Sequence, residues 1–365
     1  MPLQLGLVGL PNVGKSTLFN ALTRAGAEVA NYPFTTIAPN VGVAVVPDPR
    51  LQRIAEIVRP ERAVPAAFQV VDVAGLVKGA SQGEGLGNQF LSHVRTVDAV
   101  AMVVRCFEDE HVPHVTSTLD PVGDIETIQL ELILADLAVL ERHLERVQTQ
   151  AKARPRDFEP QIAAIERVLQ GLRAGQLVRA MDLDAHERVY LADVALLTNK
   201  PTLYIANVGE GQLPEGGELA AQVLARAREE GADAIVLSAQ LESELTELER
   251  DEALDYLAAV GLEAPALERL IWAAYRLLDD ITFFTTTGGK EVRAWTLRRG
   301  ETALEAAGAI HTDLARGFIR AEVVSYEDLD QAGSLARARE LGRLRLEGRE
   351  YVVQDGDVIH IRFAV

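Results

Sequence analysis

Eight residues near the start of the chain have the composition of a phosphate-binding loop. Residues 9–16 read Gly-Leu-Pro-Asn-Val-Gly-Lys-Ser, a complete G-x-x-x-x-G-K-S pattern between an apolar run and a helical one. Glycines let backbone N–H groups turn toward phosphate oxygens, and the helix N-terminus adds positive potential. We expect Lys15 to reach the β- and γ-phosphates of a nucleoside triphosphate and the Ser16 hydroxyl to bind Mg²⁺.

An aspartate follows the next apolar run. Asp72 begins the sequence Asp-Val-Ala-Gly, and a carboxylate at a strand end beside a phosphate loop is placed to hold Mg²⁺ through water. The N–H of Gly75 is placed to sense the γ-phosphate. Between the two motifs, residues 31–36 read Asn-Tyr-Pro-Phe-Thr-Thr. We expect Thr36, or failing it Thr35, to complete the magnesium shell when the γ-phosphate is bound.

A later motif predicts where the nucleotide base lies. Guanine readers use Asn-Lys-x-Asp, whose short carboxylate accepts hydrogen bonds from N1–H and the 2-amino group. This chain has Asn207-Val208-Gly209-Glu210, with a longer acid and no lysine. An amide such as that of Asn207 can pair with the 6-amino group and N7 of adenine. Adenine is therefore favoured and guanine stays open, with Ser238 and Ala239 predicted as the supporting loop.

The predicted elements place these motifs at strand ends of one sheet. Short apolar runs predict strands at 3–9, 67–72, 99–106, 202–207 and 234–238. Helical patterns lie between them, so we expect a parallel, doubly wound α/β sheet. Residues 125–150, 162–172 and 185–197 have helical spacing and interrupt this alternation. They predict a helical insertion at 121–199, either a projecting hairpin arm or helices that cover the sheet.

The charge distribution separates the end of the chain from the rest. The 365 residues carry 36 − 54 = −18, whereas residues 282–365 carry 12 basic and 13 acidic side chains, or −1. The first 281 residues therefore carry −17. Strand-like patterns at 282–286, 292–296, 319–324, 351–353 and 358–363 indicate a separate domain there. The acidic balance argues against a protein that binds DNA by neutralising phosphates.

Composition excludes several other classes of protein. No apolar run approaches the ~20 residues of a membrane helix, and the N-terminus lacks a signal-peptide pattern. A single cysteine, Cys106, excludes an internal disulfide and suits a reducing cytosol. We expect a cytoplasmic monomer that binds neither membranes nor specific DNA sequences.

Taken together, the motifs resemble those of the YchF family of Obg-like ATPases. The resemblance rests on the phosphate loop, Asn207-x-x-Glu210 and the segments at 33–36, 72–81, 290–296, 310–313 and 353–357. It implies a Ras-like P-loop domain from residues 1–120 and 200–281, a helical coiled-coil insertion at 121–199, and a TGS domain with a β-grasp fold at 282–365. It also implies a preference for ATP over GTP, activation by K⁺, and a link to ribosomes.

The resemblance also assigns roles to single residues. It places a catalytic histidine at His114, and in K⁺-activated relatives an asparagine at the position of Asn12 helps to coordinate the cation. The alternatives are a surface histidine and an asparagine that only permits a tight turn. Leu76 stands where Ras-type enzymes have a water-positioning glutamine, so charge compensation must come from elsewhere.

The expected catalytic residues are His114, Lys15 and Asn12. The expected metal ligands are Ser16, Thr36 and Asp72. The expected nucleotide contacts are Asn12, Val13, Gly14, Lys15, Ser16, Thr17, Gly75, Asn207, Val208, Glu210, Ser238 and Ala239.

The expected partner is the ribosome, through ribosomal RNA and protein. Five arginines and two glutamates between residues 335 and 349 give 5 − 2 = +3, which indicates an RNA contact or equally a solvated helix. The glycine-rich segment 79–87 predicts a switch that orders on nucleotide binding. We expect a Mg²⁺-dependent ATPase that acts as a switch on the ribosome. The alternatives are a GTPase and a nucleotide-gated RNA- or ribosome-binding module with incidental hydrolysis.

Overall fold

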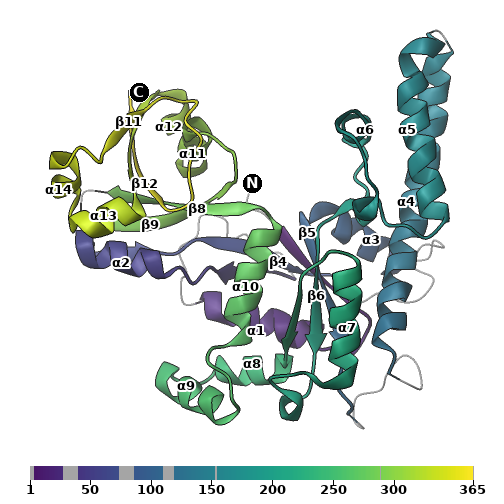
Figure 1. The fold of residues 1–365 in the computed structure, drawn as a ribbon, viewed down its shortest axis with the longest axis horizontal. Coiled ribbons are helices and arrows are strands. Elements are labelled where there is room, and N and C mark those ends of the chain that lie inside the picture. The colour runs from purple at the N-terminus through teal and green to yellow at the C-terminus, as the bar shows by residue number, and fades with distance from the viewer. Residues whose placement is uncertain are drawn as a thin grey trace.

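Two β-sheets and a helical arm make up the described part of the chain (Figure 1). The computed structural model describes residues 4–27, 40–73, 86–109, 119–152, 154–287 and 289–364. In these residues the strand order is β2-β4-β1-β5-β6-β7 in the first sheet and β11-β10-β12-β8-β9-β3 in the second. No helix in these residues is long and apolar enough to cross a membrane.

The first sheet is built from the apolar runs of the sequence. Its strands are β1 Gln4–Val8, β2 Val41–Val45, β4 Ala67–Asp72, β5 Ala99–Arg105, β6 Thr202–Asn207 and β7 Ala234–Leu237. Neighbouring strands are parallel except for the β2–β4 pair. Every residue of β5 and β6 is buried, so both faces of the sheet are covered. The predicted parallel α/β sheet is confirmed, with an antiparallel edge strand that the apolar runs did not predict.

Helices from both halves of the chain pack on this sheet. They are α1 Lys15–Ala27, α3 Leu86–Thr96, α7 Gly217–Glu229, α8 Ala239–Leu245 and α10 Ala266–Leu277. Helix α9, Arg250–Ala259, instead packs on α8, where Leu257 joins Leu241 and Leu245 in a small cluster. Helix α10 buries Leu267, Leu270 and Ala274, whose spacing puts them on one helical face. Residues 242–260 have a helical pattern that would suit a single helix, but the chain turns at residues 246–248 and forms α8 and α9 instead.

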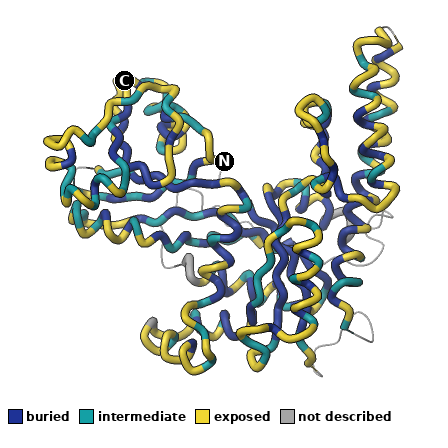
Figure 2. The backbone as a smooth tube through the Cα atoms, in the orientation of Figure 1, coloured by how far each residue is buried: buried dark blue, intermediate teal, exposed yellow. Residues whose placement is uncertain are grey.

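Helix α4, Pro121–Ala151, joins the first sheet to the arm (Figure 1). Its first half buries Ile125, Ile128 and Leu132 in the core of the sheet. Its far half packs on α5, Pro155–Arg173, in a separate apolar cluster that includes Leu140 and Val168. The insertion therefore covers the sheet and also projects from it. Figure 2 shows the buried seam of the arm between exposed outer faces.

A buried carboxylate holds the segment in which the chain returns from the arm to the sheet. After α6, Ala185–Leu191, and a short turn of helix at Leu197–Asn199, strand β6 resumes the sheet. Asp136 of α4 is fully buried and accepts hydrogen bonds from the backbone N–H groups of Leu197 and Thr198, both at 2.8 Å, and from the Thr198 hydroxyl at 2.7 Å. Burial raises the pKa of Asp136, although these donors act in the opposite direction.

The second sheet forms the C-terminal domain together with residues from the first quarter of the chain. Its strands are β3 Arg62–Val64, β8 Asp280–Thr287, β9 Glu291–Arg298, β10 Phe318–Ser325, β11 Arg345–Glu347 and β12 Asp357–Phe363. Its helices are α2 Pro49–Val58, α11 Ala303–Ile310, α12 Thr312–Arg316, α13 Tyr326–Ala332 and α14 Leu335–Glu340. Residues 351–353 form only an isolated bridge from Val352 to Thr302, so the predicted strand there is wrong. A mixed sheet with α11 packed on it is compatible with a β-grasp fold, while the TGS assignment and the domain boundaries stay predictions.

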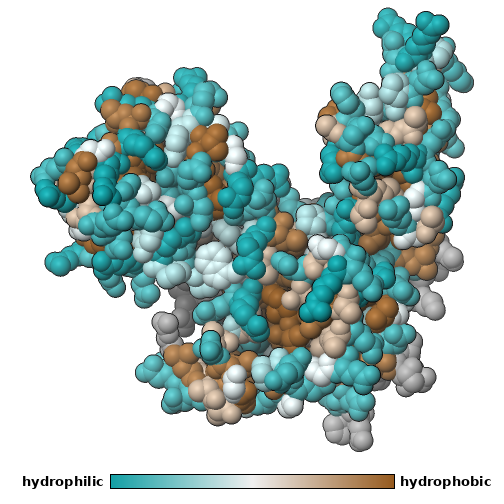
Figure 3. Space-filling model, viewed as in Figure 1, coloured by the Kyte–Doolittle hydropathy of each residue, from teal (hydrophilic) through white to brown (hydrophobic). Residues whose placement is uncertain are grey.

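Residues 48–64 tie the two sheets together. Strand β3 pairs in parallel with β9, and Arg50 donates hydrogen bonds to Asp48 at 2.7 Å and to Asp355 at 2.8 Å. Arg53 donates to Asp330 of α13 at 2.6 Å. These contacts fix the C-terminal domain on one side of the first sheet, while the arm projects on the other. The space-filling view shows an open V between them (Figure 3).

We predict that Asp136→Ala lowers the free energy of unfolding by on the order of 3 kcal/mol, because two backbone donors lose their buried acceptor. Asp193→Ala, an exposed aspartate in the same returning segment, should change it by less than about 0.5 kcal/mol. Urea unfolding followed by circular dichroism measures both. Equal effects of the two variants would contradict the role of Asp136.

Candidate functional site

A cavity of about 780 Å³ opens beyond the C-terminal ends of β1, β5 and β6. Ligands of open parallel sheets bind at this edge, because the loops after the strands meet there. The lining comes from the phosphate loop, from the residues after β5, from residues 207–210 and from the start of α8. The residues are Leu10, Pro11, Asn12, Gly14, Lys15, Ser16, Thr17, Phe107, Glu108, Asp109, Asn207, Val208, Gly209, Glu210, Ser238, Ala239 and Gln240.

The phosphate loop follows β1 and leads into α1, as its sequence predicts. Gly14 has φ +90°, and a Cβ atom there would lie 2.2 Å from the Nδ2 atom of Asn207. Only glycine fits this position, for both reasons. Asn12 has φ 62°, a conformation that asparagine adopts more readily than most residues. This geometry supports the tight-turn alternative for Asn12, and its predicted contact with a cation stays a prediction.

Three polar side chains meet at one end of the cavity. The Lys15 ammonium group forms an ion pair with Oδ1 of Asp72, and the Ser16 hydroxyl donates to Oδ2 of Asp72 at 3.1 Å. Lys15 is 9% exposed, so its charge lies in a largely desolvated position. Lys15 at the start of α1 and Asp72 at the end of β4, 57 positions apart in sequence, are thus brought together, as the motifs predict.

The oxygens of this corner suit Mg²⁺, which prefers hard oxygen ligands and keeps several water molecules. Ser16 offers a hydroxyl and Asp72 a carboxylate on the same side of the loop. The described residues contain no group of three or more His, Cys, Asp and Glu side chains that could hold a metal by themselves. A magnesium ion here would therefore need phosphate oxygens and water as its remaining ligands.

Asn207 links three parts of the site. Its Nδ2 atom donates to the carbonyl of Val13 at 2.8 Å, and its Oδ1 atom accepts from the N–H of Ala239 at 2.8 Å. Asn207 is 3% exposed, and Ser238 accepts from Leu241 to cap α8. One N–H and one lone pair of the amide remain for a base. The buried side chain of Val13 does not line the cavity; its carbonyl is the acceptor for Asn207.

Two features of the base end were not predicted from the sequence. The Tyr256 hydroxyl of α9 donates to the Glu210 carboxylate, which raises the pKa of Tyr256. Phe107 lines the cavity, with the guanidinium carbon of buried Arg105 4.6 Å from its ring centroid. Phe107 directly follows a predicted strand, at the sheet edge where the nucleotide was expected. This position could have been used to predict an aromatic residue in the cavity wall.

Several predicted residues lie outside the described part of the chain. They are Thr35 and Thr36, Gly75, Leu76, His114 and most of the glycine-rich segment 79–87. Their predicted roles stay predictions. Of the remaining predicted contacts, Thr17 and Val208 line the cavity with the residues already named.

Comparisons with known proteins match the chain over its full length. Residues 4–135 match a family described as 50S ribosome-binding GTPase, and residues 281–364 match the YchF-GTPase C-terminal family, described as a protein of unknown function. The ribosome-binding ATPase YchF of Bacillus subtilis is 51% identical over 367 residues and that of Escherichia coli O157:H7 48% over 365, each covering 100% of both chains. The solved structure of the Schizosaccharomyces pombe YchF GTPase has a TM-score of 0.89 at 36% identity, over 99% of this chain and 98% of that one.

We predict that Gly14→Ala lowers the affinity for nucleoside triphosphates by about a hundredfold or more, because a methyl group displaces the Asn207 amide and the loop together. The matched control is Gly300→Ala, which has the same φ of +90° but no atom within 4 Å of the new methyl group. Both variants should lose about 1–2 kcal/mol from the strained backbone, and only Gly14→Ala should lose binding in calorimetric titration. Normal binding by Gly14→Ala would show that the close approach does not shape the loop.

Proposed function

Because the chain belongs to the YchF family, we propose that it is a Mg²⁺-dependent ATPase whose nucleotide state controls its association with the ribosome. The meeting of Lys15, Ser16 and Asp72 at the mouth of the large cavity carries this proposal. These groups supply a cation for phosphate and two oxygen ligands for a metal ion. Relatives named ribosome-binding ATPases, at about half identity over the full chain, support the partner and the reaction.

Lys15, Ser16 and Asp72 together form what we call the phosphate corner. In the proposed binding step, these side chains exchange their contacts with one another for contacts with the nucleotide and its metal ion. Lys15 leaves Asp72 and pairs with phosphate oxygens, while backbone N–H groups of the loop and the N-terminus of α1 hold the remaining phosphate charge. Ser16 and Asp72 would hold Mg²⁺, with Thr36 as the proposed further ligand. When bound, the ion would neutralise negative charge that develops on the phosphates during transfer. The N–H of Gly75 is proposed to sense the γ-phosphate.

Hydrolysis needs groups that replace the glutamine of Ras-type enzymes. We assign this role to His114 and to a K⁺ ion held with the help of Asn12. Lys15 stabilises charge on the transferred phosphate. A cation held there would supply positive charge of the kind that an arginine finger supplies, which raises the rate by ~10³–10⁵.

The base end of the cavity supports a preference for adenine. A guanine reader accepts from N1–H and the 2-amino group with the two oxygens of one carboxylate, whereas one of these oxygens in Glu210, Oε1, already accepts from the Tyr256 hydroxyl. Phe107 offers an apolar ring to either base. Asn207 retains one N–H for N7, which both purines present. GTP therefore gains little from its distinguishing groups.

We predict that the protein binds ATP at least as tightly as GTP in calorimetric titration with Mg²⁺. Glu210→Asp should move the ratio toward GTP, because the shorter acid leaves Tyr256 and restores the length of the usual guanine reader. Glu215→Asp, an exposed glutamate outside the cavity lining, is the control and should leave the ratio unchanged. Binding of GTP about a hundredfold tighter than ATP by the unmodified protein would favour a GTPase.

We predict faster ATP hydrolysis in K⁺ than in Na⁺ at equal ionic strength. Asn12→Ala should remove this difference, and because alanine is also strained at φ 62°, the ratio of the rates in K⁺ and Na⁺ is compared rather than either rate alone. Steady-state phosphate release measures both rates. An unchanged K⁺ response in Asn12→Ala would leave Asn12 as a turn residue only.

A further inference from the structure

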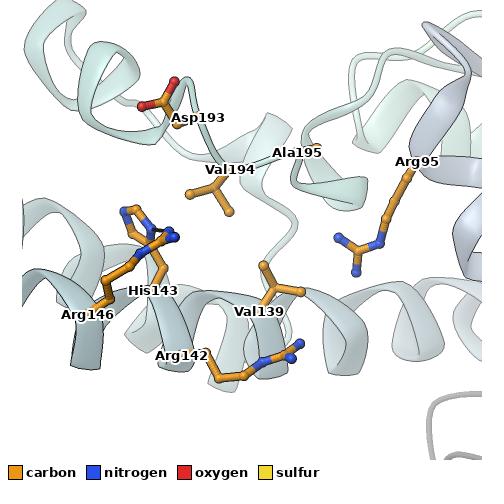
Figure 4. Close-up of a pocket in the computed structure, with 8 residues that line it drawn as sticks. All are labelled: Arg95, Val139, Arg142, His143, Arg146, Asp193, Val194 and Ala195. Carbon is orange, nitrogen blue, oxygen red and sulfur yellow. Dashed lines mark hydrogen bonds between the residues drawn. The ribbon is translucent and has the colours of Figure 1, made fainter.

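A second cavity, of about 410 Å³, lies where the arm leaves the first sheet (Figure 4). We call it the arm cavity. Its walls come from Arg95 at the end of α3, from Val139, Arg142, His143 and Arg146 of α4, and from residues 193–195 after α6. It shares no lining residue with the nucleotide cavity. The proposed ATPase reaction makes no use of it.

Three guanidinium groups make the arm cavity positive. Arg95 points into it from α3, and Arg142 and Arg146 lie along α4 on the other side (Figure 4). Arg142 donates to the carbonyl of Ala138 at 2.9 Å, which turns its guanidinium back toward the Arg95 side. None of the three forms an ion pair with a carboxylate in the described part of the chain. Against the one lining carboxylate, Asp193, the cavity carries 3 − 1 = +2.

The arginines of the C-terminal domain behave differently. Arg337, Arg339 and Arg343 form ion pairs with Glu340 at 2.9 Å, Glu322 at 3.2 Å and Asp328 at 2.6 Å. Arg345 also lies close to two carboxylates. The arginine-rich run that suggested an RNA contact in the sequence is therefore largely neutralised within its own domain. Unpaired guanidinium groups gather at the arm instead.

His143 adds an unsatisfied donor beneath these arginines. Its Nδ1 atom accepts from Arg146 at 2.6 Å, so the ring proton is on Nε2. Burial and the charge of Arg146 lower the pKa of His143, which favours the neutral ring. The residue is 9% exposed, and Nε2 has no hydrogen-bond partner among the described residues. A buried donor without a partner is unfavourable, so an oxygen acceptor that reaches Nε2 from the cavity that His143 lines would remove this cost.

The donor set and the size of the arm cavity define its ligand. Guanidinium groups bind phosphate through paired N–H donors. The volume falls within the range of small-molecule sites, about 300–1,000 Å³, and leaves room beyond a phosphate group. Val139, Val194 and Ala195 supply an apolar wall for the rest of the ligand. We propose that the arm cavity binds the phosphate group of a nucleotide-sized ligand, supplied either by one unit of an RNA strand or by a free phosphorylated small molecule.

The test uses the full-length protein with its nucleotide cavity saturated by a non-hydrolysable ATP analogue and Mg²⁺. The two probes are a fluorescent ten-nucleotide uridine RNA, followed by anisotropy, and inorganic pyrophosphate, followed by calorimetry. The double variant Arg142→Ala/Arg146→Ala should weaken the bound probe on the order of tenfold or more, because two charge-assisted contacts are lost. If RNA is the ligand, the log–log salt slope of its binding should also fall by about 1.4, from two phosphate contacts on a single strand.

The matched control, Arg154→Ala/Arg156→Ala, removes two exposed arginines from the far end of the same arm. It has the same net charge as the test variant and should bind the probes like the unmodified protein. Tight binding of RNA alone identifies a strand as the source of the phosphate, and tight binding of pyrophosphate alone identifies a free ligand. Binding of neither probe by the unmodified protein, or equal loss in both variants, would overturn the proposal. ATP hydrolysis by the test variant should stay unchanged, so failure of the arm cavity is distinguishable from failure of the ATPase assignment.

Discussion

The side-chain amide of Asn207 is the contact on which the nucleotide cavity depends. It stands at the end of β6, holds the carbonyl of Val13 in the phosphate loop, and receives the N–H that begins α8. The loop approaches it so closely that Gly14 has no room for a side chain. Phosphate end and base end of the cavity are thereby fixed to each other through one buried residue. The position of Asn207 depends in turn on where strand β6 begins after the helical insertion. Asp136 of α4 fixes that point through its hydrogen bonds to the segment before β6.

Much of this arrangement could be predicted from the sequence. The strands that carry the site are short buried runs, so their hydrophobicity alone marks them, and β4 and β6 have the bounds that the apolar runs gave. Motifs at their ends had to meet, because parallel strands end at one edge of the sheet. The meeting of Lys15, Ser16 and Asp72 follows from that topology. The edge strands β2 and β3 escaped prediction because they are short and only partly buried, and pairing with β4 and β9 defines them.

Polar side chains were harder to predict, because their roles depend on partners distant in sequence. The motif suggested that Asn207 reads the base, whereas two of its hydrogen bonds serve the fold. Glu210 accepts a hydrogen bond from Tyr256, which lies 46 residues later in the chain. No local sequence pattern predicts this contact. The arginines of α14 and β11 looked like an RNA contact because their charges were counted locally. In the fold, carboxylates from α13, β10 and β12 neutralise most of them. The arginines of the arm cavity come from the consecutive helices α3 and α4, and only the packing of α3 beside the arm brings Arg95 to the other two.

We propose that the protein is an ATPase whose nucleotide state is read by the ribosome. Among the described residues, we propose that only those of the phosphate corner respond to whether ATP or ADP is bound. The C-terminal domain and the arm are fixed to the sheet that carries this corner. Co-sedimentation of the full-length protein with ribosomes, loaded in turn with a non-hydrolysable ATP analogue and with ADP, tests this claim most directly. We predict that more protein pellets with the ribosomes in the ATP-like state than in the ADP state. Equal pelleting in the two states would contradict it.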